Sequence, residues 1–223
     1  MNKILIIPII IVGLFILRCG RWWYVNHNIE RPKTISSTMI GTIEEREMSG
    51  HLTAYVTVTW SQSQALNNGF SILANYIFWN NTKQWSIAMT APVTSKQSET
   101  IAMTAPVTSK KSEIIAMTAP VTTTNTWSVY TVGFTMPAKY TLTTLPKPNA
   151  QVITIVQETN KTLYVWKFSG YAKEKRADKQ LVLFKAALTE NKLSHATDFT
   201  LAQYNDPRTP WFMRINERWV EKQ

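Results

Sequence analysis

The chain has 223 residues, the length of one or two domains, and its 44% hydrophobic content is sufficient for a core. The charged fraction of 17% excludes a disordered, highly charged chain, and the single cysteine, Cys19, excludes disulfide frameworks and paired-cysteine zinc or redox motifs. The formal charge of +10 favours anionic partners. The sequence has no basic run of five residues and no zinc-finger or RNA-binding motif, so nucleic acid is not the expected ligand.

The N-terminus begins with an uncharged run of 14 residues, Ile4–Leu17, between basic residues. A helix of this length spans about 21 Å, less than the ~30 Å of a hydrocarbon core, which suits a signal peptide. No small residues form a cleavage site after the run, however, and the aromatic residues 22–24 follow as at a membrane interface. We predict an uncleaved anchor or signal-anchor over residues 1–25, with a periplasmic or extracytoplasmic domain after it. The alternatives are a cleaved export signal and a buried core segment.

The first half of the remaining chain predicts two strands, a helix and two more strands. Residues 26–41 lack periodicity and are predicted to be a linker. Strands are expected over 42–49 and 52–60, joined by a turn at Ser49-Gly50. The predicted helix, 64–78, carries apolar residues at i, i+4, i+7 and i+11, the spacing of one helical face. These residues are Leu66, Phe70, Leu73 and Ile77. A strand follows the helix, and another covers 127–136.

The second half predicts the same order of elements. Strands are expected over 151–157, 162–168, 197–204 and 212–220, with a helix over 173–191 between the two pairs. The apolar stripe of this helix has the spacing of the first one, and its members are Ala177, Leu181, Phe184 and Leu188. We therefore predict an internally duplicated α+β domain over 42–222, (ββαββ)2, with an antiparallel sheet. Each half is too small to cover its own sheet face, so the halves should share one core.

A heptapeptide, Ile-Ala-Met-Thr-Ala-Pro-Val, occurs at 87–93, 101–107 and 115–121, with a period of 14. An even period preserves the alternation of side chains in a strand. The proline in each copy restricts it to edges, bulges or strand ends. We expect one copy to lie in the sheet and the others to form a protruding hairpin or a mobile loop.

Several separated motifs carry a family resemblance. They are GFSILANYIF at 69–78 before the first heptapeptide, YTLTTLPKPN at 140–149, FSG at 168–170, and QYNDP at 203–207 with MRINERW at 213–219. Together they resemble the SOUL haem-binding protein family over about residues 42–222. The resemblance implies a twisted, barrel-like sheet with two flanking helices, and a site for haem or a related tetrapyrrole.

A haem site requires an apolar slot and donors for two propionates, and it can include an axial ligand. The apolar candidates are Leu66, Phe70, Leu73 and Ile77 on the first helix, with Met89 and Met117 of the repeats as soft ligands or core residues. Arg46 and Arg214 are the candidates for the propionates, or they form structural ion pairs. Some members of the family carry a histidine after the first-strand arginine. Glu47 takes that place here, so His51 is the candidate axial ligand, and no other metal site is predicted.

The resulting prediction is a protein that binds haem or a related porphyrin reversibly and without catalysis. No HExxH, GxSxG, Walker or GxGxxG pattern occurs, so an enzyme is not expected. One alternative is an effector-type domain, or a general binder of amphipathic aromatic molecules, that takes no haem. Another is a membrane-anchored module whose repeat loop binds a protein partner.

Overall fold

The computed structural model describes residues 29–58, 62–82, 113–126, 129–205 and 209–223, together with single residues between 12 and 24. Among these residues, no helix is both long enough and apolar enough to cross a bilayer. Most of the predicted anchor, residues 1–25, lies outside the described residues, as do the first two copies of the heptapeptide.

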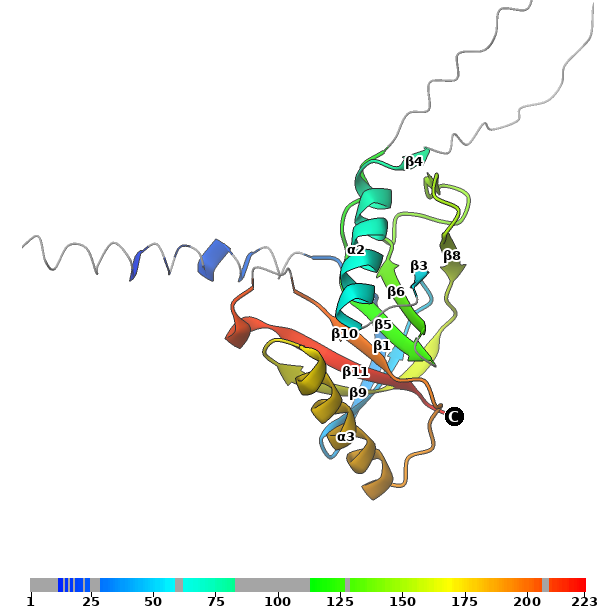
Figure 1. Ribbon diagram of the computed structural model, residues 1–223. Helices are drawn as coiled ribbons and strands as arrows, with labels where there is room; N and C mark the ends of the chain where they lie inside the picture. The colour runs from blue at the N-terminus through cyan, green and yellow to red at the C-terminus, as the bar shows by residue number, and fades with distance from the viewer. Residues whose placement is uncertain are drawn as a thin grey trace, which may run out of the picture.

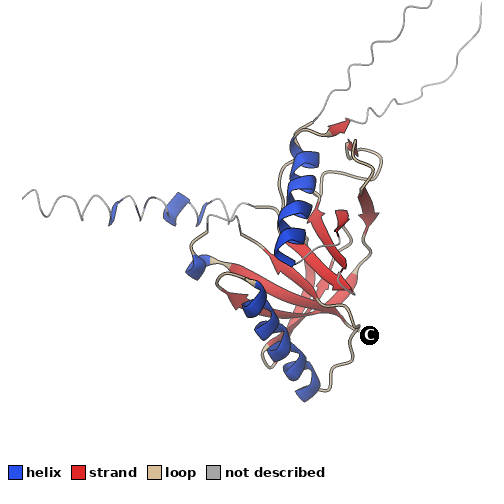
Figure 2. Ribbon diagram, in the orientation of Figure 1, coloured by secondary structure: helices blue, strands red, loops and turns tan. Residues whose placement is uncertain are grey.

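One curled antiparallel sheet forms the body of the protein, with two helices on its outside (Figure 2). Its strand order is β1-β2-β9-β11-β10-β5-β6-β3-β8. The strands are β1 (Thr34–Ile40), β2 (Ile43–Met48), β3 (Leu52–Val58), β5 (Val121–Thr126), β6 (Val129–Thr135), β8 (Ile153–Gln157), β9 (Lys161–Ser169), β10 (Thr200–Gln203) and β11 (Ile215–Glu221). A second, two-stranded sheet pairs β4 (Asn81–Thr82) with β7 (Lys147–Pro148).

The helices are α2 (Gln62–Phe78) and α3 (Glu174–Glu190). Helix α2 packs on β3 and β6, where Leu73 and Ile77 enter a core cluster with Val132. Helix α3 packs on β2 and β11, where Phe184 joins a second cluster. A third cluster, which includes Trp219, lies on the opposite face of β9 and β11, because alternate residues of a strand point to opposite faces. The helices therefore cover the outside of the sheet in two separate places (Figure 1).

The α+β class and the curled antiparallel sheet agree with the sequence prediction. The order strand–strand–helix–strand–strand occurs in both halves, as β2-β3-α2-β5-β6 and β8-β9-α3-β10-β11. Duplication of one ancestral unit stays a prediction.

Two segments differ from the sequence prediction. Residues 34–40, expected within the linker, form β1, which pairs with β2 at an edge of the sheet. Six of its seven residues are exposed, so the strand has no buried face and no apolar alternation. Residues 212 and 213, expected at the start of the last strand, belong instead to the 3-10 turn η1 (Trp211–Met213), which follows Pro210.

The third copy of the heptapeptide lies against the body. Ile115 is fully buried, and its N–H donates to the carbonyl of Ile77 at the end of α2. The N–H of Ala119 donates to the carbonyl of Glu30, and Val121 begins β5. This copy therefore joins α2, the N-terminal chain and the sheet.

Candidate functional site

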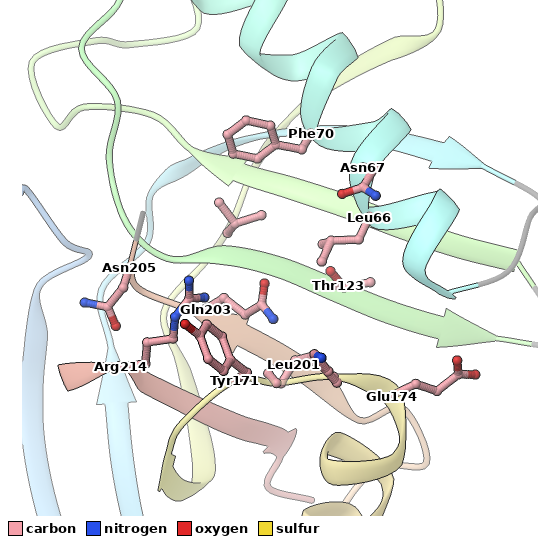
Figure 3. Close-up of a pocket in the computed structure, with 13 residues that line it drawn as sticks. Leu66, Asn67, Phe70, Thr123, Tyr171, Glu174, Leu201, Gln203, Asn205 and Arg214 are labelled. Atoms are coloured by element: carbon pink, nitrogen blue, oxygen red, sulfur yellow. The ribbon is translucent and has the colours of Figure 1, made fainter. Parts of the chain in front are cut away.

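A pocket of about 340 Å³ lies between α2 and the segment that leads into α3, over β5 and β10 (Figure 3). This volume falls in the lower part of the ~300–1,000 Å³ range typical of small-molecule sites. Its apolar wall consists of Leu66, Phe70, Val121 and Leu201. The rest of the lining comprises Asn67, Thr123, Tyr171, Ala172, Lys173, Glu174, Gln203, Asn205 and Arg214.

The apolar stripe of α2 serves two purposes. Leu66 and Phe70, in its first half, line the pocket, and Phe70 also contacts the ring of Phe134 edge-on at 5.2 Å. Leu73 and Ile77, one and two turns further on, are 0% and 1% exposed. They are core residues and do not line this pocket, so a contact between them and a ligand stays a prediction. The stripe is continuous, but of its four residues only Leu73 and Ile77 are fully buried.

The wall opposite α2 comes from the turn between β9 and α3. Gly170 has a φ of 92°, a conformation that favours glycine, and its carbonyl accepts a hydrogen bond of 2.8 Å from Nδ2 of Asn216. The turn places Tyr171 across the pocket from Phe70 and Leu66 (Figure 3).

Two basic side chains, Lys173 and Arg214, and the acidic Glu174 line the pocket, with Arg214 and Glu174 toward opposite ends of it (Figure 3). The guanidinium of Arg214 lies 4.5 Å from the centre of the Tyr171 ring, and its Nε donates to the carbonyl of Thr209 at 2.9 Å. These contacts orient Arg214 at the pocket. Basic groups at the edge of an apolar slot are suited to a ligand that carries carboxylates.

Arg46, the other arginine predicted for the propionates, does not line this pocket. It donates to Glu44 at 2.8 and 2.9 Å and to Glu217 twice at 3.0 Å. Glu217 also accepts from Tyr204 at 2.5 Å and from Trp219 at 2.6 Å. For Arg46 the structure therefore shows the structural ion pair that was the alternative to a propionate contact, because its guanidinium is committed to a buried ion network.

The same network shifts two ionisation equilibria. Hydrogen bonds from Arg46 lower the pKa of Glu44 to about 2, against the opposing effect of burial. Burial and the neighbouring Glu217 carboxylate raise the pKa of Tyr204 well above its ordinary value. Both residues therefore keep one protonation state near neutral pH, as structural groups do.

The predicted iron ligands lie away from the pocket. His51 is in the turn between β2 and β3, with Nδ1 2.9 Å from the carbonyl oxygen of Ser49, and it borders a different cavity inside the curled sheet. Met117 is 41% exposed and does not line the pocket, while Met89 lies outside the described residues. Within the described ranges, no group of three or more His, Cys, Asp or Glu residues could hold a metal ion.

Sequence reasoning missed several residues of the lining, above all Tyr171, Gln203 and Asn205. A signal was present, since Tyr171 directly follows the FSG motif and QYN contributes Gln203 and Asn205. Two of the family motifs therefore end at the pocket.

The fold and the pocket define an α+β domain with a ligand-sized site between its two helices. The sequence matches the family described as SOUL heme-binding protein over residues 32–221, so the chain belongs to that family. None of the curated proteins matches it. Matching solved structures include a protein described as a bacterial transcription regulation protein from Staphylococcus aureus MU50. It is 9% identical, with a TM-score of 0.41, and the match covers 81% of this chain and 97% of that one.

Proposed function

We propose that this protein binds haem or a related tetrapyrrole reversibly in the pocket between α2 and α3, without catalysing a reaction. Membership of the SOUL family supports the ligand class. The observation that carries the location is an apolar slot with Lys173 and Arg214 at its rim. Two other cavities, one beside the buried ion network and one inside the curled sheet, have a more polar lining.

The residues present fit such a ligand. A tetrapyrrole of the haem type is a flat apolar ring with two carboxylates on one edge, so it needs apolar walls and cations on one side. Leu66 and Phe70 would contact one side of the ring, and Leu201 the other. Lys173 and Arg214 would hold the propionates and so orient the ring. Haem, when bound, would supply the chemistry of its iron, while these side chains bind it, orient it and exclude water.

A haemin titration of the full-length protein tests the proposal, with Soret absorbance and tryptophan quenching as the two signals. We expect saturable one-to-one binding, and about tenfold weaker binding for Leu66→Ser, because an apolar contact of that size is worth about 1.5 kcal/mol. Lys173→Ala should also weaken haemin but not a porphyrin ester that lacks carboxylates. Leu183→Ser, at a position on α3 that is 43% exposed, is the matched control. Equal affinities for all variants would place the ligand elsewhere.

The second candidate is a binder of amphipathic aromatic molecules other than haem. The amides of Asn67, Gln203 and Asn205 favour it, because they line the pocket and a porphyrin ring offers them few hydrogen-bond partners. Competition between haemin and a planar aromatic dye distinguishes the two. A dye that binds tightly while haemin does not saturate would select this candidate.

Two further parts of the proposal concern segments mostly outside the described residues. The apolar N-terminal run would anchor the protein, with the domain on the periplasmic or extracytoplasmic side. The heptapeptide loop would be available to a protein partner. Protease protection in sealed vesicles tests the first, and a pull-down that compares the intact protein with a loop deletion tests the second.

A further inference from the structure

Two neighbouring aromatic side chains protrude from one end of the sheet. Trp211 and Phe212 lie in η1 and are 60% and 51% exposed, and their rings contact each other edge-on at 5.8 Å. Ile215, at the start of β11, is 41% exposed. We call residues 211–213 the aromatic turn. Tryptophan is characteristic of the interfacial zone of membranes, where its ring meets both lipid and water.

Several basic side chains, and the acidic Glu174, lie on segments that adjoin the aromatic turn. Arg214 follows it directly, and Lys173 lines the same pocket as Arg214. Arg31 lies over the ring of Tyr204 at 5.0 Å, and Arg176 donates to the carbonyl of Ser169 at 2.8 Å. Basic groups next to a membrane that contains anionic lipid contribute about 1 kcal/mol each. The combination of exposed aromatic and basic side chains therefore matches an anionic lipid surface.

The N-terminal chain joins the domain at this same end. Arg31 lines one cavity together with Arg214 and Ile215, so it lies next to the aromatic turn. The apolar run 4–17 and the aromatic residues 22–24 precede it in sequence. The seven residues from 24 to 31 span at most about 24 Å, even when fully extended. If the aromatic residues 22–24 lie at a bilayer surface, the aromatic turn therefore stays close to that surface. In Figure 1, the red turn before β11 lies on the side from which the blue N-terminal residues approach.

We propose that the aromatic turn and its basic neighbours dock on the surface of an anionic lipid bilayer, with Trp211 and Phe212 in the headgroup region. Tyr171 and Arg214 belong to the rim of the haem pocket, so docking would bring that rim to the bilayer, from which an apolar ligand could enter. The docking itself does not depend on haem binding and is tested without haem.

The experiment uses the full chain in nanodiscs of phosphatidylcholine and phosphatidylglycerol. In a Cys19→Ser background, Trp211→Cys is labelled with an environment-sensitive fluorophore, and Val182→Cys and Leu142→Cys serve as controls. Both control positions are exposed in water, at 66% and 53%. We expect a blue-shifted emission for the label at position 211 and quenching by lipids that carry a nitroxide near the headgroup. Neither control should respond, and nanodiscs of phosphatidylcholine alone should give a weaker response.

A second measurement does not depend on the label. In the unmodified chain, the amides of residues 209–215 should exchange hydrogen more slowly in anionic nanodiscs than in detergent. The double variant Trp211→Ser, Phe212→Ser should lose this protection. If the label at position 211 is as accessible to water as the controls and residues 209–215 gain no protection, docking is refuted, although the N-terminal run could still hold the chain. A chain that does not associate with anionic nanodiscs refutes docking as well.

Discussion

Replacement of Arg46 by methionine separates a structural arginine from a ligand-binding one. The side chain is buried, and its four hydrogen bonds to Glu44 and Glu217 measure 2.8–3.0 Å. Methionine keeps much of the volume but leaves two buried carboxylates without their cation. Removal of one partner from a buried ion pair costs about 3–5 kcal/mol. We expect Arg46→Met to lower the free energy of unfolding by an amount near 3 kcal/mol, because Lys167 still pairs with Glu44 at 2.6 Å.

Urea denaturation followed by tryptophan fluorescence measures this loss. A loss of about 3 kcal/mol is large against the ~5–15 kcal/mol of a typical domain, so the shift in midpoint will be clear. The double variant Arg46→Met with Glu217→Gln should lose less free energy of unfolding than the two single variants lose together, by about 1–3 kcal/mol. Haemin affinity should stay unchanged while the variant is folded. A loss below about 1 kcal/mol, together with weaker haemin binding, would refute this reasoning and return Arg46 to the ligand site.

Three further predictions concern stability. The pKa of Glu44 is lowered from 4.5 to about 2, so its contribution to the free energy of unfolding is complete above pH 4.5 and is lost as the pH falls toward 2. Glu44→Gln should therefore make the free energy of unfolding depend less on pH in that window. The same pH dependence in both proteins would contradict the assignment. Gly69→Ala should destabilise the protein by about 1–3 kcal/mol in thermal unfolding, because the added Cβ would lie 2.6 Å from Cγ2 of the buried Val132. Unchanged stability would show that α2 can shift to make room for the methyl group. Deletion of residues 85–112 keeps Glu113, whose backbone forms hydrogen bonds with the side chain of Asn81. Calorimetry of this variant should therefore give a melting temperature close to that of the intact protein. A much lower melting temperature would show that the deleted residues support the fold.

Helical periodicity identified the apolar face of α2, but it did not show which residues of that face line a pocket and which pack in the core. Leu66 and Leu73 are the same residue type on the same stripe, yet one borders a pocket and the other is fully buried. The difference depends on where the sheet ends beneath the helix. That position is set by strand pairing between distant segments, which a local pattern does not contain.

The two arginines illustrate the same limit for charged groups. One partner of Arg46, Glu44, is two residues away in the chain, but the other, Glu217, is 171 residues away and is not indicated by the local sequence. Within the MRINERW motif, the sequence predicted a task for Arg214 but not for Asn216 or Glu217. The structure places Arg214 at the pocket, Asn216 at the Gly170 turn and Glu217 in the buried network.

Strand β1 was not predicted from the sequence, for a different reason. As an edge strand with both faces exposed, it needs no apolar alternation, and its pairing with β2 comes from backbone hydrogen bonds that any residue can make. The strands that were predicted, such as β3 with its buried Ala54 and Val56, each have a face in the core.

The location of the ligand is tested most directly by methyl NMR of the full-length protein with a diamagnetic gallium porphyrin. The account predicts saturable shifts for Leu66, Val121 and Leu201, which line the pocket. Leu73 in the core beneath α2 and Leu163 in the cluster on the opposite sheet face should not respond. Saturable shifts centred on Leu163 and the turn that holds His51, with Leu66 and Leu201 unchanged, would contradict the account.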